Sequence, residues 1–167
     1  QTLVFSQSRQ ILNIIERLLK NRHFKTLRID GTVTHLLERE KRINLFQQNK
    51  DYSVFLLTTQ VGGVGLTLTA ATRVVIFDPS WNPATDAQAV DRVYRIGQKE
   101  NVVVYRLITC GTVEEKIYRR QENNHQGSPR HCLLNWSKGG ISPNANEQRT
   151  IHVTQNIRYA LNTYERV

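Results

Sequence analysis

Cysteine and long apolar runs are the features that this chain of 167 residues has least of. Only Cys110 and Cys132 are present, too few for a disulfide framework or a zinc site, so a reducing cellular interior is expected. No run approaches the roughly 18 consecutive apolar residues of a membrane span. The chain opens on Thr2-Leu3-Val4-Phe5 without a basic and apolar secretory leader. We therefore expect neither a secreted disulfide scaffold nor a membrane partner.

Several signatures of self-contained active sites are also missing. The sequence contains no G-x4-G-K-[ST] phosphate-binding loop and no G-x-G-x-x-G dinucleotide fingerprint. Its five histidines show no metal-ligand spacing with cysteines or carboxylates, and no nucleophile elbow or carboxylate dyad is visible. No metal site is predicted, and a nucleotide-binding metabolic enzyme is disfavoured.

Acidic residues are the minority among the charges. The formal net charge is +9, and the first 121 residues hold 18 Lys and Arg against 11 Asp and Glu, so the excess lies mainly there. Such a balance favours a polyanionic partner, nucleic acid or nucleotide.

Apolar runs alternate with amphipathic stretches over residues 1–121. Strands are expected at residues 2–6, 26–29, 53–58, 73–77 and 102–108. Helices are expected between them, with Ile11, Ile15, Leu18 and Leu19 on one stripe, at 36–48 with Leu36, Ile43 and Phe46 facing inward, after Asn82 and Pro83, and from Thr112 to Arg120. Continuous apolar strands alternating with helices predict an α/β fold, a largely parallel sheet covered on both faces in three αβα layers.

The loops that follow the strands are predicted to lie together, because ligands and loops gather beyond the carboxyl ends of parallel strands. These loops are Ser6-Gln7, Asp30-Gly31, residues 58–65 and residues 78–82. After residue 121 the composition changes to turn formers rich in Asn, Gly, Ser and Pro. We therefore divide the chain into a domain at 1–121 and an irregular or disordered tail at 122–167, in which 150–167 favours a weak helix or strand.

The most informative run is Gln88–Gln98. On a helix, Gln88, Arg92 and Arg95 share one face, beside an apolar stripe that includes Ala89 and Val93. Two guanidiniums on one rigid helix suit a polyphosphate, and we expect them to reach toward the edge where the loops converge. The alternative is a solvated helix face with two ordinary arginines.

Three further features have both a functional and a structural interpretation. Gly62-Gly63-Val64-Gly65 follows a strand and Thr59, and it predicts either close backbone approach to a phosphate or a flexible turn. Arg39, Lys41 and Arg42 form either a nucleic-acid contact or a solvated charged face, which is the commoner case. The stiff segment Asp78–Pro83 either aims the following helix or simply packs Trp81.

Taken together, five collinear blocks resemble the second RecA-like lobe of the Swi/Snf-type DNA translocases of helicase superfamily two, and its excision-repair-like members above all. The blocks are Thr2–Gln7, Arg28–Gly31 with Arg39 and Phe46 behind it, Thr58–Leu68, Asp78–Pro83 and Gln88–Gln98. The resemblance covers residues 1–121, and it implies a RecA-like domain of an ATP-driven motor whose nucleotide lies between two lobes.

The resemblance also implies roles for individual residues. Arg92 and Arg95 correspond to the family's arginine fingers, while Gln88 and Gly65 correspond to nucleotide-sensing positions. An arginine finger in phosphoryl transfer contributes about 10³–10⁵ in rate. The expected DNA contacts are Thr59, Gly62, Gly63 and Arg39.

The implied cofactor is ATP with Mg²⁺, held mainly by an N-terminal RecA-like lobe in cis that this sequence lacks. The implied partners are double-stranded DNA and that lobe, and the resemblance admits a mitotic kinase. The implied location is nuclear or chromosomal, or cytoplasmic outside mitosis. The tail at 122–167 matches nothing in the family. Two hypotheses follow: the C-terminal half of a translocase, inactive as an isolated chain, or a truncated and catalytically inert module that binds DNA or a partner.

Overall fold

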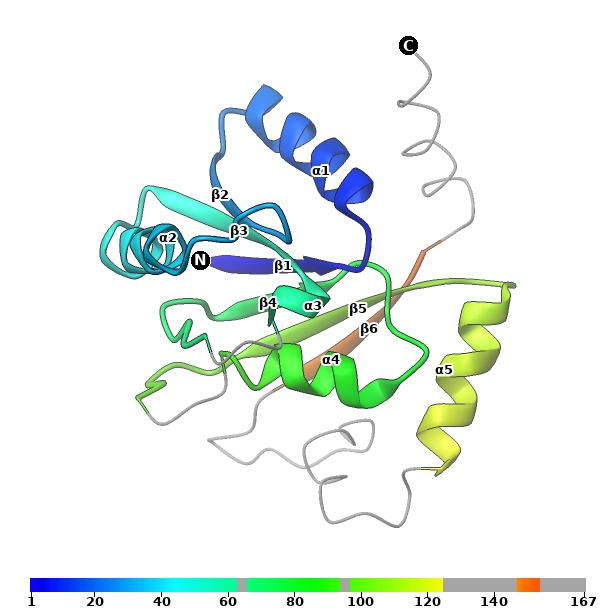
Figure 1. Ribbon diagram of the computed structural model, residues 1–167. Coiled ribbons are helices and arrows are strands. Elements are labelled where there is room, and N and C mark those ends of the chain that lie inside the picture. The colour runs from blue at the N-terminus through cyan, green and yellow to red at the C-terminus, as the bar shows by residue number, and fades with distance from the viewer. Residues whose placement is uncertain (63–65, 94–96, 125–146, 154–167) are drawn as a thin grey trace.

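The structure, a computed structural model, describes residues 1–62, 66–93, 97–124 and 147–153. Its centre is a six-stranded sheet with the order β2-β3-β1-β4-β5-β6, in which every neighbouring pair is parallel. The strands are β1 (Thr2–Ser6), β2 (Lys25–Ile29), β3 (Tyr52–Thr58), β4 (Arg73–Ile76), β5 (Val103–Thr109) and β6 (Glu147–Val153). The predicted α/β class with a parallel sheet is confirmed (Figure 1).

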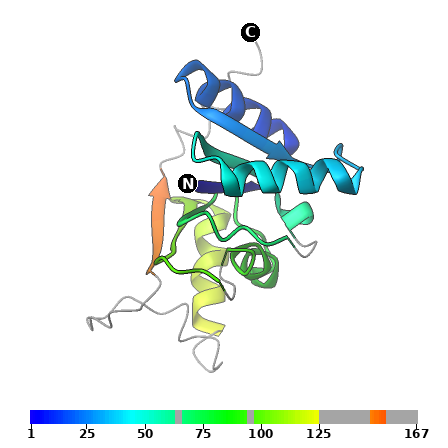
Figure 2. The same ribbon diagram turned by 90° about the vertical axis from the view of Figure 1, so that its left-hand side faces the viewer.

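Helices cover both faces of this sheet (Figures 1 and 2). They are α1 (Arg9–Asn21), α2 (Leu36–Gln48), α3 (Thr59–Gly62), α4 (Pro83–Val90) and α5 (Val113–Asn124). One core cluster joins the sheet to α2, α3 and α4, and a second joins the opposite face to α1. In β1 the two faces alternate, since Leu3 and Phe5 belong to the first cluster and Val4 to the second. The fold therefore has three layers.

Local sequence signals explain where several helices begin. Ser8 is the N-cap of α1, and Asn82 is the N-cap of α4, where its side chain accepts from the Ala84 amide at 3.0 Å and Pro83 takes the first helical position. Both the start of α4 and the bounds of α2 agree with the sequence prediction.

Two packing expectations are wrong in part. Leu36 was expected to face inward with Ile43 and Phe46, but its exposed fraction is 63% while Phe46 is fully buried. Leu36 is the first residue of α2, and residues at a helix end often lie outside the packed face. In α1 the expected stripe omitted Leu12, which is fully buried and packs with Ile15 and Leu19 in a regular helical stripe.

The tail contributes the sixth strand, β6, which overlaps the stretch from residue 150 for which a weak helix or strand was expected. α5 continues to Asn124, and β6 pairs with β5 without interruption from Val103↔Glu147 to Thr109↔Val153. An open strand edge offers unpaired backbone groups, and here a tail segment takes that position. The rest of the predicted irregular tail, 125–146 and 154–167, lies outside the described residues.

Candidate functional site

The carboxyl edge of the sheet joins the loop after β1 to the loop after β4. The Asp78 carboxylate accepts hydrogen bonds from the Ser6 hydroxyl at 3.1 Å and from the Gln7 amide at 3.0 Å. The Gln7 side chain returns the contact by donating to the Asp78 and Pro79 carbonyls at 3.0 and 3.2 Å. Two of the four predicted loops are therefore fixed to each other.

The next residues form a corner between β4 and α4, held by side chains from two helices. The Ser80 amide donates to both carboxylate oxygens of Asp86 in α4, at 3.1 and 3.2 Å. The Gln121 side chain of α5 donates to the Trp81 carbonyl at 2.6 Å and to the Ser80 carbonyl at 3.4 Å. The Trp81 side chain itself is 73% exposed, so simple packing of that ring does not explain the corner.

Asp86 is the buried charge behind this corner, with 3% of its surface exposed. Burial raises the pKa of its carboxyl group from 3.8 to about 6, and nearby Asp78 also acts to raise it. The Ser80 amide and the charge of Arg106 oppose that rise in pKa. Sequence analysis missed Asp86 and Gln121, because nothing in their spacing marks them as partners of Ser80.

The helix that carries Gln88 is shorter than predicted. α4 ends at Val90, and the amides of Arg92 and Val93 then bond to carbonyls three residues back, at 3.3 and 3.0 Å. The Leu68 amide donates a hydrogen bond to the Arg92 carbonyl at 3.0 Å. The expectation that one helix carries both Gln88 and Arg92 is therefore wrong, because the chain tightens after Val90 and the Arg92 carbonyl accepts from a residue outside the helix.

Gln88 and Arg92 nevertheless lie together. The Arg92 Nε donates to the Gln88 carbonyl at 3.2 Å, and the half-buried arginine follows the fully buried Ala89 of the predicted apolar stripe. Val93, on the same stripe, is also fully buried. Arg95 lies outside the described residues.

The backbone of Arg92 lies just beyond the end of α4. α4 begins beyond the carboxyl end of β4 and runs back along the sheet (Figure 1), so Arg92 follows the end of α4 that is far from the converging loops. The Arg92 Nε is bonded to the Gln88 carbonyl, and the reach of this guanidinium toward the loops stays a prediction. A helix after a parallel strand must return toward the start of the next strand, which takes its last residues away from the carboxyl edge.

The predicted phosphate-binding turn is described only in part. Thr59 begins α3 directly after β3 and is buried, with 5% of its surface exposed, and Gly62 ends α3. Gly63 and Gly65 lie outside the described residues. Thr59 and Gly62 are thus placed at the carboxyl edge, as the loop prediction requires.

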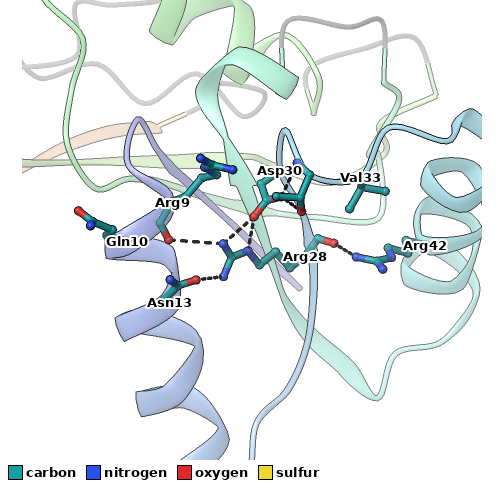
Figure 3. A pocket seen from close by; sticks show the side chains of 8 residues that line it. Arg9, Gln10, Asn13, Arg28, Asp30, Val33 and Arg42 are labelled. Carbon is teal, nitrogen blue, oxygen red and sulfur yellow. Dashed lines mark hydrogen bonds and ion pairs between the residues drawn. The ribbon is translucent and has the colours of Figure 1, made fainter. Parts of the chain in front are cut away.

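A basic pocket of about 500 Å³ lies beside β2, where three arginines (Arg9, Arg28 and Arg42) line it together with Asp30 (Figure 3). The Arg28 guanidinium is already occupied by partners within the protein, since it bonds to Asp30, Asn13 and Glu16. Burial acts to raise the pKa of Asp30, but hydrogen bonds from Thr32 and the Arg28 guanidinium outweigh it and keep that pKa below its usual range.

In the predicted basic cluster on α2, Arg39 and Arg42 donate hydrogen bonds to backbone carbonyls of the preceding segment. The half-buried Arg39 donates from Nε to the Val33 carbonyl at 2.6 Å, and Arg42 donates from Nη1 to the Arg28 carbonyl at 2.5 Å. Lys41 is exposed. The solvated-face interpretation therefore does not describe Arg39 and Arg42, which brace the loop beside the pocket.

The described part of the chain holds neither a metal cluster nor a membrane-spanning helix. Among these residues there is no group of three or more His, Cys, Asp or Glu that could hold a metal ion. None of their helices is both long and apolar enough to cross a membrane.

The chain is similar to known proteins over most of residues 1–121. The family of helicase conserved C-terminal domains matches residues 1–97. DNA excision repair protein ERCC-6-like of Bos taurus is 95% identical over 121 residues, which are 72% of this chain and 10% of that protein. SNF2 domain-containing protein ENL1 of Oryza sativa subsp. japonica is 58% identical over 71% of this chain and 12% of its own length. DNA excision repair protein ERCC-6 of Homo sapiens is 54% identical over 72% of this chain and 8% of its own length.

A solved structure agrees with these sequence matches. The crystal structure of the C-terminal part of the Fun30 ATPase domain has a TM-score of 0.68 and 42% identity, covering 71% of this chain and 38% of that one. The resemblance inferred from the five blocks is confirmed. The chain spans about a tenth of the length of the curated relatives it matches.

Proposed function

Since the chain belongs to the family of helicase conserved C-terminal domains, we propose that it is the second half of an ATP-dependent double-stranded-DNA translocase of the Swi/Snf type. Its partner in this proposal is the N-terminal RecA-like lobe of the same motor, and the two lobes hydrolyse ATP only together. The similarity to DNA excision repair protein ERCC-6-like and to an SNF2 domain-containing protein supports this assignment.

The observation that carries the proposal is the fixed pair of Gln88 and Arg92. The Arg92 Nε is held on the Gln88 carbonyl, and the Arg92 carbonyl is held by the Leu68 amide, so the arginine is anchored at both its side chain and its backbone. A preorganised guanidinium suits the charge of a transferring phosphoryl group. ATP with Mg²⁺, held mainly by the other lobe, would supply that group, and Arg92 and Arg95 of this chain would neutralise its charge.

DNA is assigned to a different side of the domain. Thr59 and Gly62 lie at the carboxyl edge, and Arg39 braces the loop beside the basic pocket, whereas Arg92 lies beyond the far end of α4. Separate surfaces for polymer and nucleotide suit a motor that couples the two through lobe movement. By resemblance to the Polo-kinase-interacting checkpoint helicase we infer a nuclear or chromosomal location, or a cytoplasmic one outside mitosis, and a mitotic kinase partner.

The second candidate is a catalytically inert module that binds DNA or a partner. It is supported by the change of composition after residue 121 to turn formers rich in Asn, Gly, Ser and Pro. This alternative predicts the same DNA binding but no contribution to hydrolysis.

Reconstitution separates the two candidates. The chain is mixed with a first lobe made separately from bovine ERCC-6-like, and ATP hydrolysis is measured with and without double-stranded DNA. We expect no DNA-stimulated hydrolysis by the isolated chain and DNA-stimulated turnover by the mixture. Arg92→Ala or Arg95→Ala should reduce that turnover by about 10³-fold or more while DNA binding is retained, and Arg22→Ala, at an exposed position, is the control. Turnover that survives both finger substitutions would refute the role given to these arginines.

A further inference from the structure

The peptide group of Ser80 is shared by two helices. Its N–H donates to Asp86 of α4, at 3.1 and 3.2 Å, and its carbonyl accepts from Gln121 of α5, at 3.4 Å. Gln121 also holds the neighbouring Trp81 carbonyl, at 2.6 Å. α5 therefore touches the corner from which α4 starts.

A short series of hydrogen bonds connects this corner to Arg92. Asn82 caps α4, and the helix is only eight residues long. Just after its end, the Asp91 amide donates a helical hydrogen bond to the Ala87 carbonyl at 2.9 Å. The Arg92 Nε then bonds to the Gln88 carbonyl. A helix of two turns with both ends anchored moves as a unit, so a displacement at Ser80 is carried to Gln88 and Arg92.

The contact from Gln121 is not required to satisfy buried groups. Ser80 is half-buried and Trp81 is exposed, so water can reach their carbonyls when the side chain is removed. Loss of this contact should therefore have little effect on global stability. The two hydrogen bonds that the Gln121 side-chain amide donates instead fix the distance between α5 and the start of α4.

We propose that Gln121 is a positioning residue, which fixes the Ser80–Trp81 corner and, through α4, the setting of Gln88 and Arg92. The functional meaning of this inference rests on the proposed role of Arg92 in ATP hydrolysis. It assigns to α5 an influence on the nucleotide side of the domain.

Nuclear magnetic resonance of the 1–167 chain tests the positioning without any nucleotide. Gln121→Glu keeps the shape but removes the donor, Gln121→Lys keeps a donor, and Arg120→Ala is an exposed control on the same helix turn. In Gln121→Glu we expect the amides of Ser80 and Ala84 to exchange about fivefold faster, the size expected for one hydrogen bond, and the Arg92 Nε–H signal to move. Amides of β3 should be unchanged, and Gln121→Lys should restore the native behaviour.

Three results would overturn the proposal: unchanged exchange at Ser80 and Ala84, an unmoved Arg92 signal, or an equal acceleration throughout β3, which would mean general destabilisation. With a first lobe added, Gln121→Glu should lower kcat while leaving the affinity for DNA unchanged. If the wild-type mixture hydrolyses no ATP, the proposed function fails, but the exchange experiment still decides the positioning.

Discussion

The buried carboxylate of Asp86 makes the stability of this domain depend on pH in an unusual direction. Its pKa is about 6 in the folded protein against 3.8 without burial, so the folded state binds this proton more tightly than the unfolded state. Stability from this group is therefore gained as pH falls through 6 toward 3.8 and is missing at pH 7. Since one pKa unit corresponds to about 1.4 kcal/mol, the whole effect is about 3 kcal/mol. Linkage places about 1 kcal/mol of it between pH 7 and pH 5.

Other carboxylates act outside this pH window. For Glu16 and Asp30, burial acts to raise the pKa, but hydrogen bonds and neighbouring cations outweigh it and lower the pKa below the ordinary values of 4.5 and 3.8. Their contribution to stability is present above those values and is lost only in more acidic solution. The interval from pH 7 to pH 5 therefore isolates Asp86 from both.

The measurement is urea unfolding of the wild type and of Asp86→Asn, followed by circular dichroism at pH 7 and at pH 5. Asparagine keeps an oxygen acceptor for the Ser80 amide but does not titrate. The wild type should gain about 1 kcal/mol more than the variant on going from pH 7 to pH 5. An equal change in both proteins, or a larger gain in the variant, would refute the assignment of the raised pKa to Asp86.

Two substitutions with matched controls test the packing and the backbone. Phe46 is fully buried with its ring 4.9 Å from that of Phe55, so Phe46→Ala should lower the free energy of unfolding by about 3–5 kcal/mol, whereas Leu37→Ala, at an 80% exposed side chain, should change it by less than about 0.5 kcal/mol. Gly97 has a φ of +106°, so Gly97→Ala should cost about 1 kcal/mol or more. Gly31→Ala is the control, because Gly31 has no positive φ and nothing within 4 Å of an added Cβ. Urea unfolding measures all four, and equal effects within either pair would contradict the structural reason.

The sheet could be predicted because its signals are local. β1 and β3 are nearly continuous apolar runs that are buried on both faces, and Asn82-Pro83 starts α4 through its own cap. The end of α4 could not be predicted in this way. The apolar stripe continues past Val90, but the contact between Leu68 and Arg92 decides where the chain leaves the helix, and it joins residues that no periodic pattern relates.

The sequence predicted which residues belong to the candidate site better than it predicted which of them contact one another. Gln7 and Asp78 are 71 positions apart, and Trp81 and Gln121 are 40 apart. Such pairs have no fixed spacing, since their contact depends on which strands become neighbours. The role of Asp86 depends on burial, which the sequence pattern of a short helix does not reveal.

The central place of β1 has a consequence for how the domain assembles. Its neighbours in the sheet are β3 and β4, and they emerge from a ribosome about 50 and 70 residues later, as their positions at 52–58 and 73–76 require. Within this sheet, β1 is therefore synthesised before both of its neighbours and stays unpaired with them until they emerge. Contacts between such distant segments are formed slowly, so the nascent apolar strand is exposed to other chains during that interval, and this is the period in which we expect the protein to depend on chaperones.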